Sequence, residues 1–182
     1  MAVREIRCIP DPILRRKAKK VPSIDGSVKS LIADMKDTLG KARGVGLAAP
    51  QVGVSLRIIV LQMPEQQALC LVNPEVIKRS GEREVTEGCL SVPGYQGKLK
   101  RSAEVTVKGL DASGCKVRIK ATDLMSQTLE HEIDHLNGVL YIDRIGEDGE
   151  FYRLEETDKE EEKKVEAEGK EKQEREADAV RQ

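Results

Sequence analysis

The sequence is poor in aromatic residues, with no Trp, one Phe and three Tyr among 182 residues. It also lacks any run of the roughly 20 apolar residues that a membrane span needs, so we expect no membrane association. Residues 1–7 carry neither an apolar stretch of signal length nor a small-residue cleavage site. We therefore expect a cytoplasmic protein whose core is built from Val, Ile, Leu, Met and Ala.

The sequence has few cysteines, and none of them are closely spaced. The four cysteines are Cys8, Cys70, Cys89 and Cys115, and no C-x-x-C pair occurs. Without a secretion signal, we expect reduced thiols rather than two disulfides. The missing pair also argues against a structural zinc finger. We interpret Cys8, Cys70 and Cys115, which lie in strand-like apolar runs, as core or inert residues.

The net charge of −1 hides an asymmetry along the chain. Residues 1–145 carry 23 basic and 17 acidic side chains, whereas residues 146–182 carry 8 basic and 15 acidic ones. We predict a folded domain over 1–145 and a charged extension over 146–182, either a solvated helix or disordered. The basic excess permits an anionic partner, but no aromatic-studded basic run is present, so we expect no direct nucleic-acid binding.

Hydrophobic periodicity predicts an α+β fold of small antiparallel or mixed sheets around a central helix. Helical spacing is found over 27–42 and over 122–137. Strands are expected over 56–61, over 68–77 with an interruption at Asn73-Pro74, and in a hairpin of 103–108 with 115–120. The further elements are a short helix capped by Asp11 and a strand or extended exit over 139–142.

The only two histidines form the pattern His131-Glu132-Ile133-Asp134-His135. On a helix this spacing places both imidazoles on one face, where they can hold one metal ion, with Glu132 beside an open position as general base. The alternative is a chance pair on an exposed helix. A hydrolytic metal site of this kind usually has three protein ligands and one water.

A third ligand would have to be Cys, Asp or Glu. Cys89 lies in the segment Glu87-Gly88-Cys89-Leu90-Ser91, where glycine lets backbone approach a site and the N–H after the cysteine would face a developing negative charge. On the pattern alone, a small buried hydrophobe is the more frequent role of such a cysteine.

A glycine-rich segment over 44–53 matches the loose dinucleotide-binding fingerprint G-x-G-x-x-A. That fingerprint needs a strand before it and a helix after it, whereas here a helix precedes and Pro50 with a strand follows. We therefore reject a nucleotide site. Gln51 at the end of the segment offers an amide that would donate to an oxyanion, although a lone glutamine is usually a surface residue.

Together, three segments resemble the peptide deformylase family, which is marked by G-x-G-L-A-A-x-Q, E-G-C-L-S and H-E-x-x-H in that order. The chain carries them at 44–51, 87–91 and 131–135, and the resemblance extends over about residues 3–145. It implies removal of the formyl group from the N-terminal formylmethionine of nascent polypeptides, a co-translational step of protein biosynthesis. The metal, natively Fe(II) and replaceable by Ni, Co or Zn, would be held by Cys89, His131 and His135.

The resemblance also implies roles for the remaining site residues. A metal-bound hydroxide would attack the formyl carbon, with Glu132 moving the proton to the leaving amine and with Gln51 and the Leu90 N–H stabilising the oxyanion. The peptide would lie extended along Val45, Gly46 and Gly88. The methionine side chain would enter a pocket, for which the expected lining is Val45, Val85, Leu124, Gln127 and Thr128.

Several positions depart from the family pattern. Gln127 and Thr128 are more polar than the usual aliphatic residues, which leaves open a related metallohydrolase acting on another N-acyl amine or peptide. Arg101 needs a carboxylate partner other than the usual one, because Arg43 stands where that partner is expected. Glu130 would be an outer carboxylate of the metal site or would face water. The acidic extension replaces the basic helix that docks some relatives on ribosomes, so only proximity to the ribosome is expected.

Overall fold

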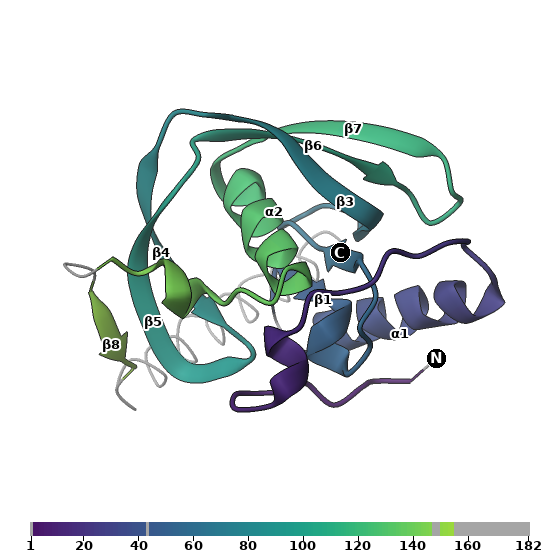
Figure 1. Ribbon diagram of the computed structural model, residues 1–182, viewed down its shortest axis with the longest axis horizontal. Helices are drawn as coiled ribbons and strands as arrows, with labels where there is room; N and C mark the ends of the chain where they lie inside the picture. Colours follow the sequence, from purple (N-terminus) through teal and green to yellow (C-terminus); the bar gives the residue numbers. More distant parts are fainter. Residues whose placement is uncertain (1, 43, 147–149, 155–182) are drawn as a thin grey trace, which may run out of the picture.

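The computed structural model describes residues 2–42, 44–146 and 150–154. Helix α2 lies in the middle of the fold, with strands of the two antiparallel sheets around it (Figure 1). The larger sheet has the strand order β1-β2-β3-β6-β7 and the smaller one the order β4-β5-β8. The strands are β1 (Gly46–Ala48), β2 (Ile58–Leu61), β3 (Leu69–Ser80), β4 (Arg83–Cys89), β5 (Val92–Arg101), β6 (Glu104–Leu110), β7 (Lys116–Thr122) and β8 (Phe151–Arg153). The predicted α+β class is confirmed.

The part of the larger sheet formed by β1, β2 and the first half of β3 is buried between two helices, α1 (Gly26–Ala42) and α2 (Asp123–Leu136). Alternate residues of β2 face opposite ways: Ile58 and Val60 pack with α1, whereas Ile59 and Leu61 pack with α2. Because both faces are covered, this strand is a continuous apolar run rather than an alternating one. Both helices lie where the sequence predicted them, within a few residues.

Helix α1 presents one apolar stripe to the sheet. The buried residues of that stripe recur at helical spacing and include Val28, Leu31, Met35 and Leu39. Asp25 precedes the helix and accepts a hydrogen bond from the backbone N–H of Val28 at 3.0 Å. This carboxylate satisfies one of the N–H groups that a helix start leaves without a partner.

The smaller sheet was largely missed by the sequence analysis. Strands β4 and β5 form a hairpin. Its residues Val85, Val92 and Leu99 belong to a third core cluster, separate from the two that pack against α1 and α2. Strand β3 also continues through Asn73, which takes a left-handed φ of 52° at a shift in register instead of ending the strand. Its side-chain amide is held by the backbone of Val21, donating and accepting at 2.9 Å.

The sequence predicted that the segment after α2, residues 139–142, forms a strand or an extended exit. The prediction of a strand is wrong. A 3₁₀ helix, η3 (Tyr141–Arg144), forms there, and the Asp143 carboxylate accepts the Leu140 N–H at 2.8 Å. A local side-chain cap of this kind favours a turn over sheet pairing. The short helix capped by Asp11 is confirmed as η1 (Pro12–Arg15).

The described structure continues past the predicted boundary at residue 145, because β8 pairs with β5. Most of the charged extension, residues 155–182, lies outside the described residues. Among the helices of the described ranges, none is long and apolar enough to cross a bilayer.

Candidate metal centre and active site

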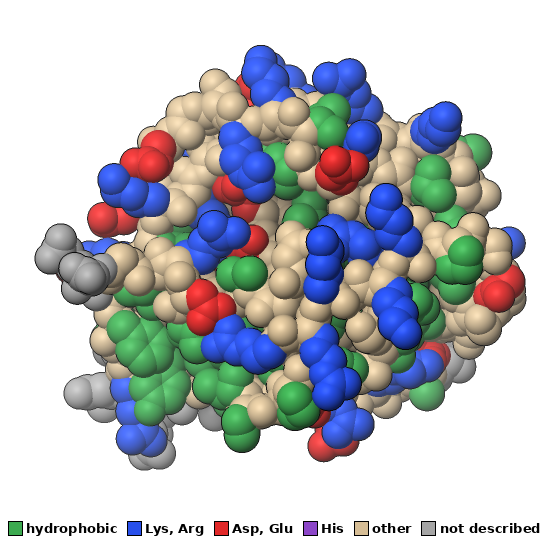
Figure 2. All heavy atoms as spheres, in the orientation of Figure 1, with side chains coloured by type: hydrophobic (Ala, Val, Ile, Leu, Met, Phe, Trp, Pro, Cys, Tyr) green, Lys and Arg blue, Asp and Glu red, His purple; other side chains and the backbone are tan. Residues whose placement is uncertain are grey.

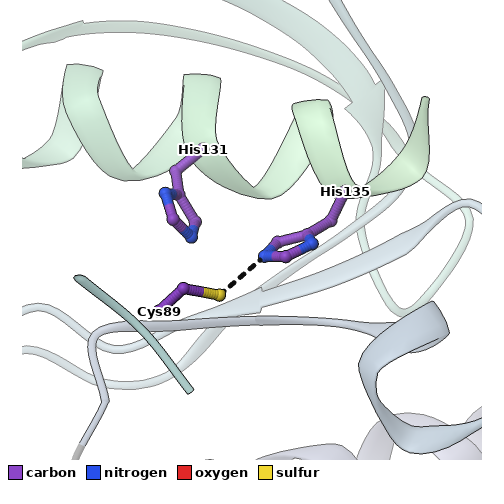
Figure 3. Close-up of side chains that lie close together, drawn as sticks. All are labelled: Cys89, His131 and His135. Atoms are coloured by element: carbon purple, nitrogen blue, oxygen red, sulfur yellow. Dashed lines mark hydrogen bonds between the residues drawn. The ribbon is translucent and has the colours of Figure 1, made fainter. Parts of the chain in front are cut away.

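Three potential metal ligands converge at the end of β4 and on α2. The Cys89 sulfur and the ring nitrogens of His131 and His135 lie within 4.8 Å of one another, with Cys89 Sγ 3.2 Å from His135 Nε2 (Figure 3). The two rings, one helical turn apart, have centroids 5.0 Å apart and meet edge to face. Thiolate and imidazole are donors that suit zinc, iron, cobalt and nickel. The donor set therefore fits one such divalent ion.

A buried ionic network fixes the orientation of His131. Its Nδ1 lies 2.8 Å from Glu87 Oε2, and Arg101 donates to both oxygens of Glu87 at 2.8 and 2.9 Å. Arg101 also donates to Asp134 at 2.6 Å. Burial alone would raise the pKa of Glu87, but hydrogen bonds from Arg101 and His131 outweigh it and hold the pKa at about 2. An ionised Glu87 keeps the proton of His131 on Nδ1 and directs Nε2 to the cluster.

The carboxylate of Glu132 is buried beside these ligands with one oxygen unsatisfied. Only 3% of the residue is exposed, and its Oε2 has no hydrogen-bond partner among the described residues. Burial raises the pKa of Glu132 to about 7. A buried acceptor without a protein partner costs free energy, which a bound water or ion would recover. This orphan oxygen supports the fit of a cation with its water.

The side chain of Gln51 also lies close to Cys89. Its Oε1 accepts the backbone N–H of Ala48 at 2.8 Å, which turns Nε2 toward Ser91 Oγ at 3.1 Å and Cys89 Sγ at 3.7 Å. The side chain is therefore buried and aimed at the cluster, unlike the surface position that is usual for a lone glutamine. Ser91, whose N–H lies 3.4 Å from Cys89 Sγ, was not foreseen as a member of the site.

These groups open onto a cavity of about 520 Å³. Most residues that the sequence analysis assigned to the site line it: Val45, Gly46, Gln51, Gly88, Cys89, Leu90, Leu124, Gln127, Thr128, His131 and Glu132. The cavity wall also contains residues that were missed, among them Thr86, Tyr95 and Leu154.

Comparison with known proteins agrees with this geometry. The family model described as polypeptide deformylase matches residues 3–150. The chain is 55% identical over 155 residues to a peptide deformylase of Dehalococcoides mccartyi, covering 85% of this chain and 93% of that protein. A peptide deformylase of Halothermothrix orenii is 53% identical over 151 residues, with 82% and 98% covered. The chain belongs to the peptide deformylase family.

Solved structures of the family have the same fold. A peptide deformylase from Legionella pneumophila superposes with a TM-score of 0.78 at 47% identity, covering 80% of this chain and 88% of that one. One from Ehrlichia chaffeensis in complex with actinonin gives a TM-score of 0.78 at 36% identity, with 81% and 91% covered. Peptide deformylases are metal-dependent hydrolases that remove the formyl group from nascent peptides.

One residue that the family resemblance placed in the methionine pocket does not line the cavity. Val85 is buried instead with Leu14 and Tyr141 in the third core cluster. Along β4, successive side chains point to opposite faces, so Val85 shares its face with Glu87, which lines the cavity, whereas Thr86 and Gly88 lie on the other face. The place of Val85 in the methionine pocket therefore stays a prediction, whereas Thr86, which lines the cavity, was not foreseen.

The polar side chains of the pocket are engaged in hydrogen bonds with the protein. Gln127 Nε2 donates to the carbonyl of Thr86 at 3.1 Å, and the Thr128 hydroxyl donates to the carbonyl of Leu124 at 2.8 Å. A ligand in the cavity therefore meets fewer unpaired hydrogen-bond donors than the residue types Gln and Thr suggest.

The expectations for Glu130 are both wrong. This carboxylate is 7% exposed, accepts the Ser102 N–H at 2.8 Å and pairs with Arg79 at 2.8 Å. It fastens α2 to the start of β6 rather than facing water or the metal ligands. By contrast, Arg101 has the carboxylate partners that the sequence required, in Glu87 and Asp134.

All four cysteines are free thiols, as predicted. Cys70 is buried in β3, and burial raises the pKa of its thiol to about 12. Cys8 is partly buried, and its sulfur lies 3.5 Å from the carbonyl oxygen of Leu90. Cys115 is exposed in the turn before β7, so its placement in a core-like strand is wrong.

Proposed function

We propose that Cys89, His131 and His135 hold one divalent ion, natively Fe(II), and that the chain deformylates N-formylmethionyl nascent peptides at this site. Ni, Co and Zn suit the same donors. The observation that carries the proposal is the convergence of the three ligand atoms within 4.8 Å beside a buried carboxylate, at the base of a cavity. When bound, such an ion supplies a water of lowered pKa and polarises the formyl carbonyl.

Glu132 is proposed as the group that moves the proton. Its carboxylate lies at the cavity wall, is shielded from solvent and has an oxygen with no partner among the described residues. A pKa near 7 suits both halves of the task, since Glu132 must take a proton from water and then return it to the leaving amine. General acid–base catalysis of this kind contributes about 10²- to 10⁴-fold.

Gln51 and the backbone N–H of Leu90 are proposed to stabilise the oxyanion. The Gln51 amide is held in place by Ala48, and its Nε2 is directed toward Cys89, next to which the formyl group would lie. A donor fixed in advance needs no reorganisation during the reaction, which makes it effective.

The substrate backbone is proposed to lie between two sheet edges. Both β1 and β4 are edge strands, and Val45, Gly46 and Gly88 from these segments line the cavity. An edge strand has free backbone donors and acceptors that pair with an extended peptide whatever its side chains are. The methionine side chain would then contact Leu124, Gln127 and Thr128.

A second candidate function is hydrolysis of another N-acyl amine or peptide at the same site. It is favoured by the polar residues Gln127 and Thr128, although both donate to backbone carbonyls.

Three further expectations remain proposals. These are a catalytic domain over residues 1–145 with 146–182 as an extension, action in the cytoplasm, and action near the ribosome, where formylated peptides emerge.

The experiment compares formyl-Met-Ala-Ser with acetyl-Met-Ala-Ser as substrates, under anaerobic conditions, for the wild type and for Glu132→Ala. We expect kcat/KM to favour the formyl peptide by at least about 10²-fold in the wild type. Glu132→Ala should lose about 10²- to 10⁴-fold in kcat and keep its metal. Preference for the acetyl peptide would select the second candidate, and retained turnover in Glu132→Ala would reject its role as base.

A further inference from the structure

The few aromatic residues of this chain are all gathered beside the cavity. Tyr95 lines it and stacks on Phe151 with ring centroids 5.1 Å apart and planes 7° apart. Tyr152 follows Phe151 on β8. Tyr141 donates its hydroxyl to the carbonyl of Tyr95 at 3.0 Å and stacks on His131 at 6.2 Å. With no Trp in the sequence, these are all of the Tyr and Phe residues that the chain has.

Strand β8 brings the residue that follows it, Leu154, to the cavity wall. It pairs with β5 in the register Tyr95↔Arg153 and Gly97↔Phe151, and the following N–H, of Leu154, donates to Gly94 at 2.9 Å. Leu154 itself lines the cavity. The segment before β8 reaches β5 because Gly97 has no side chain: a Cβ there would lie 3.2 Å from the carbonyl oxygen of Glu150 and closer still to Ile145.

Half of the exposed large hydrophobic residues in the described ranges lie at the cavity or stack on a residue that lines it. Of the eight exposed large hydrophobic residues in the described ranges, Val45, Tyr95 and Leu124 line the cavity, and Phe151 stacks on Tyr95. Tyr95 is 37% exposed and Phe151 is 50% exposed. A group of hydrophobic side chains is visible in Figure 2 on the side where Figure 1 draws β8 beside β5. Clustered apolar exposure of this kind marks a binding surface.

We infer that Tyr95, Phe151 and Leu154 form a wall, here named the β8 wall, that binds apolar side chains of the two substrate residues following the formylmethionine. The inference rests on the proposed function. It commits to the substrate peptide as occupant because Tyr95 and Leu154 are continuous with the cavity that holds the reacting end. An extended peptide advances about 3.3 Å per residue, so its following residues must leave across the cavity rim.

The β8 wall acts on binding rather than on chemistry. Its side chains belong to the rim and not to the metal ligands, so they contact the substrate equally in the ground state and the transition state. An interaction of that kind lowers KM and leaves kcat unchanged. Selectivity for one apolar side chain in a half-exposed site is modest, about fivefold.

The experiment measures KM and kcat for formyl-Met-Leu-Leu and formyl-Met-Ser-Ser with the wild type, Phe151→Ser, Leu154→Ser and the control Ile77→Ser. Ile77 is an exposed apolar residue of β3 that does not line the cavity. We expect the KM for formyl-Met-Leu-Leu to be about fivefold lower than the KM for formyl-Met-Ser-Ser in the wild type and in Ile77→Ser, with equal kcat. Both wall variants should reduce this ratio of the two KM values to less than twofold while keeping the kcat for formyl-Met-Ser-Ser.

Equal KM for the two peptides in the wild type would overturn the inference and leave the proposed function intact, as would an unchanged ratio in both wall variants. Absence of turnover on both formyl peptides would instead overturn the proposed function, and the β8 wall with it. Gly97→Ala offers a second route to the same readout. Displacing β8 in that variant should reduce the ratio in the same way, and an unchanged ratio would contradict the role given to β8.

Discussion

Replacing Gly46 by Ala tests the geometry of the proposed base without touching a metal ligand. Gly46 lies on β1 directly against Glu132: a Cβ built there would be 2.8 Å from both Cγ and Cδ of that side chain, and nearer still to Oε1. Ordinary contact begins near 3.4 Å, so the added methyl would push the carboxylate aside by about 0.6 Å or more. Glu132 is 3% exposed and has little room to yield.

The displacement of Glu132 in Gly46→Ala should lower kcat. Misplacing a catalytic group by about 1 Å costs on the order of 10²-fold, so we expect kcat of Gly46→Ala to fall by about that factor. The metal content should stay at the wild-type level, because the contacts of the new methyl are with Glu132. Overpacking should also lower the free energy of unfolding by about 1–3 kcal/mol.

The assay measures kcat on formyl-Met-Ala-Ser, metal per chain and urea denaturation for Gly46→Ala and for Gly40→Ala. Gly40 is the matched control, since it lies in α1 and a Cβ there would meet no atom within 4 Å. Gly40→Ala should keep full activity and gain up to about 1 kcal/mol in the free energy of unfolding. A kcat for Gly46→Ala within twofold of the wild type would refute the placement of Glu132 as the base.

The remaining predictions concern the core, the thiols and the extension. Leu129→Ala, at a fully buried position of α2, should lower the free energy of unfolding by about 2–5 kcal/mol in urea denaturation, and a loss below 1 kcal/mol would contradict its core position. Iodoacetamide at pH 8 should modify exposed Cys115 and spare Cys70, whose pKa near 12 keeps the thiol protonated until the chain unfolds; mass spectrometry of the native protein checks this. Truncation after Leu154 should leave kcat/KM on formyl-Met-Ala-Ser within twofold, and a large loss at equal folded fraction would place the extension in the catalytic domain.

Elements with a local signal could be predicted from the sequence. The periodic apolar residues of α1 and α2 and the turn around Asp111, whose carboxylate accepts the Ser113 N–H at 2.8 Å, determine structure from within a few residues. Strand β5 carries no such signal, because Gly94, Gln96 and Gly97 interrupt its alternation. It forms through pairing with β4 and β8, which sequence periodicity does not report.

The candidate site divides in the same way. The histidine pair could be found because one helical turn sets its geometry, whereas the roles of Cys89 and Gln51 were expected only through the family resemblance. The partners of Glu130 depend on how the segment between β5 and β6 packs against α2, and they were wrongly expected. Leu154 was missed because the sequence analysis placed it in the charged extension, whereas pairing of β8 brings it to the cavity.

The central claim is that the Cys89 thiolate completes a metal site with the two histidines. Its most direct test is metal content per chain after anaerobic purification of the wild type, Cys89→Ala and the control Cys115→Ala. The account predicts about one divalent ion in the wild type and in Cys115→Ala, and a loss of most of it in Cys89→Ala. Unchanged metal content in Cys89→Ala would remove that sulfur from the ligand set and contradict the account.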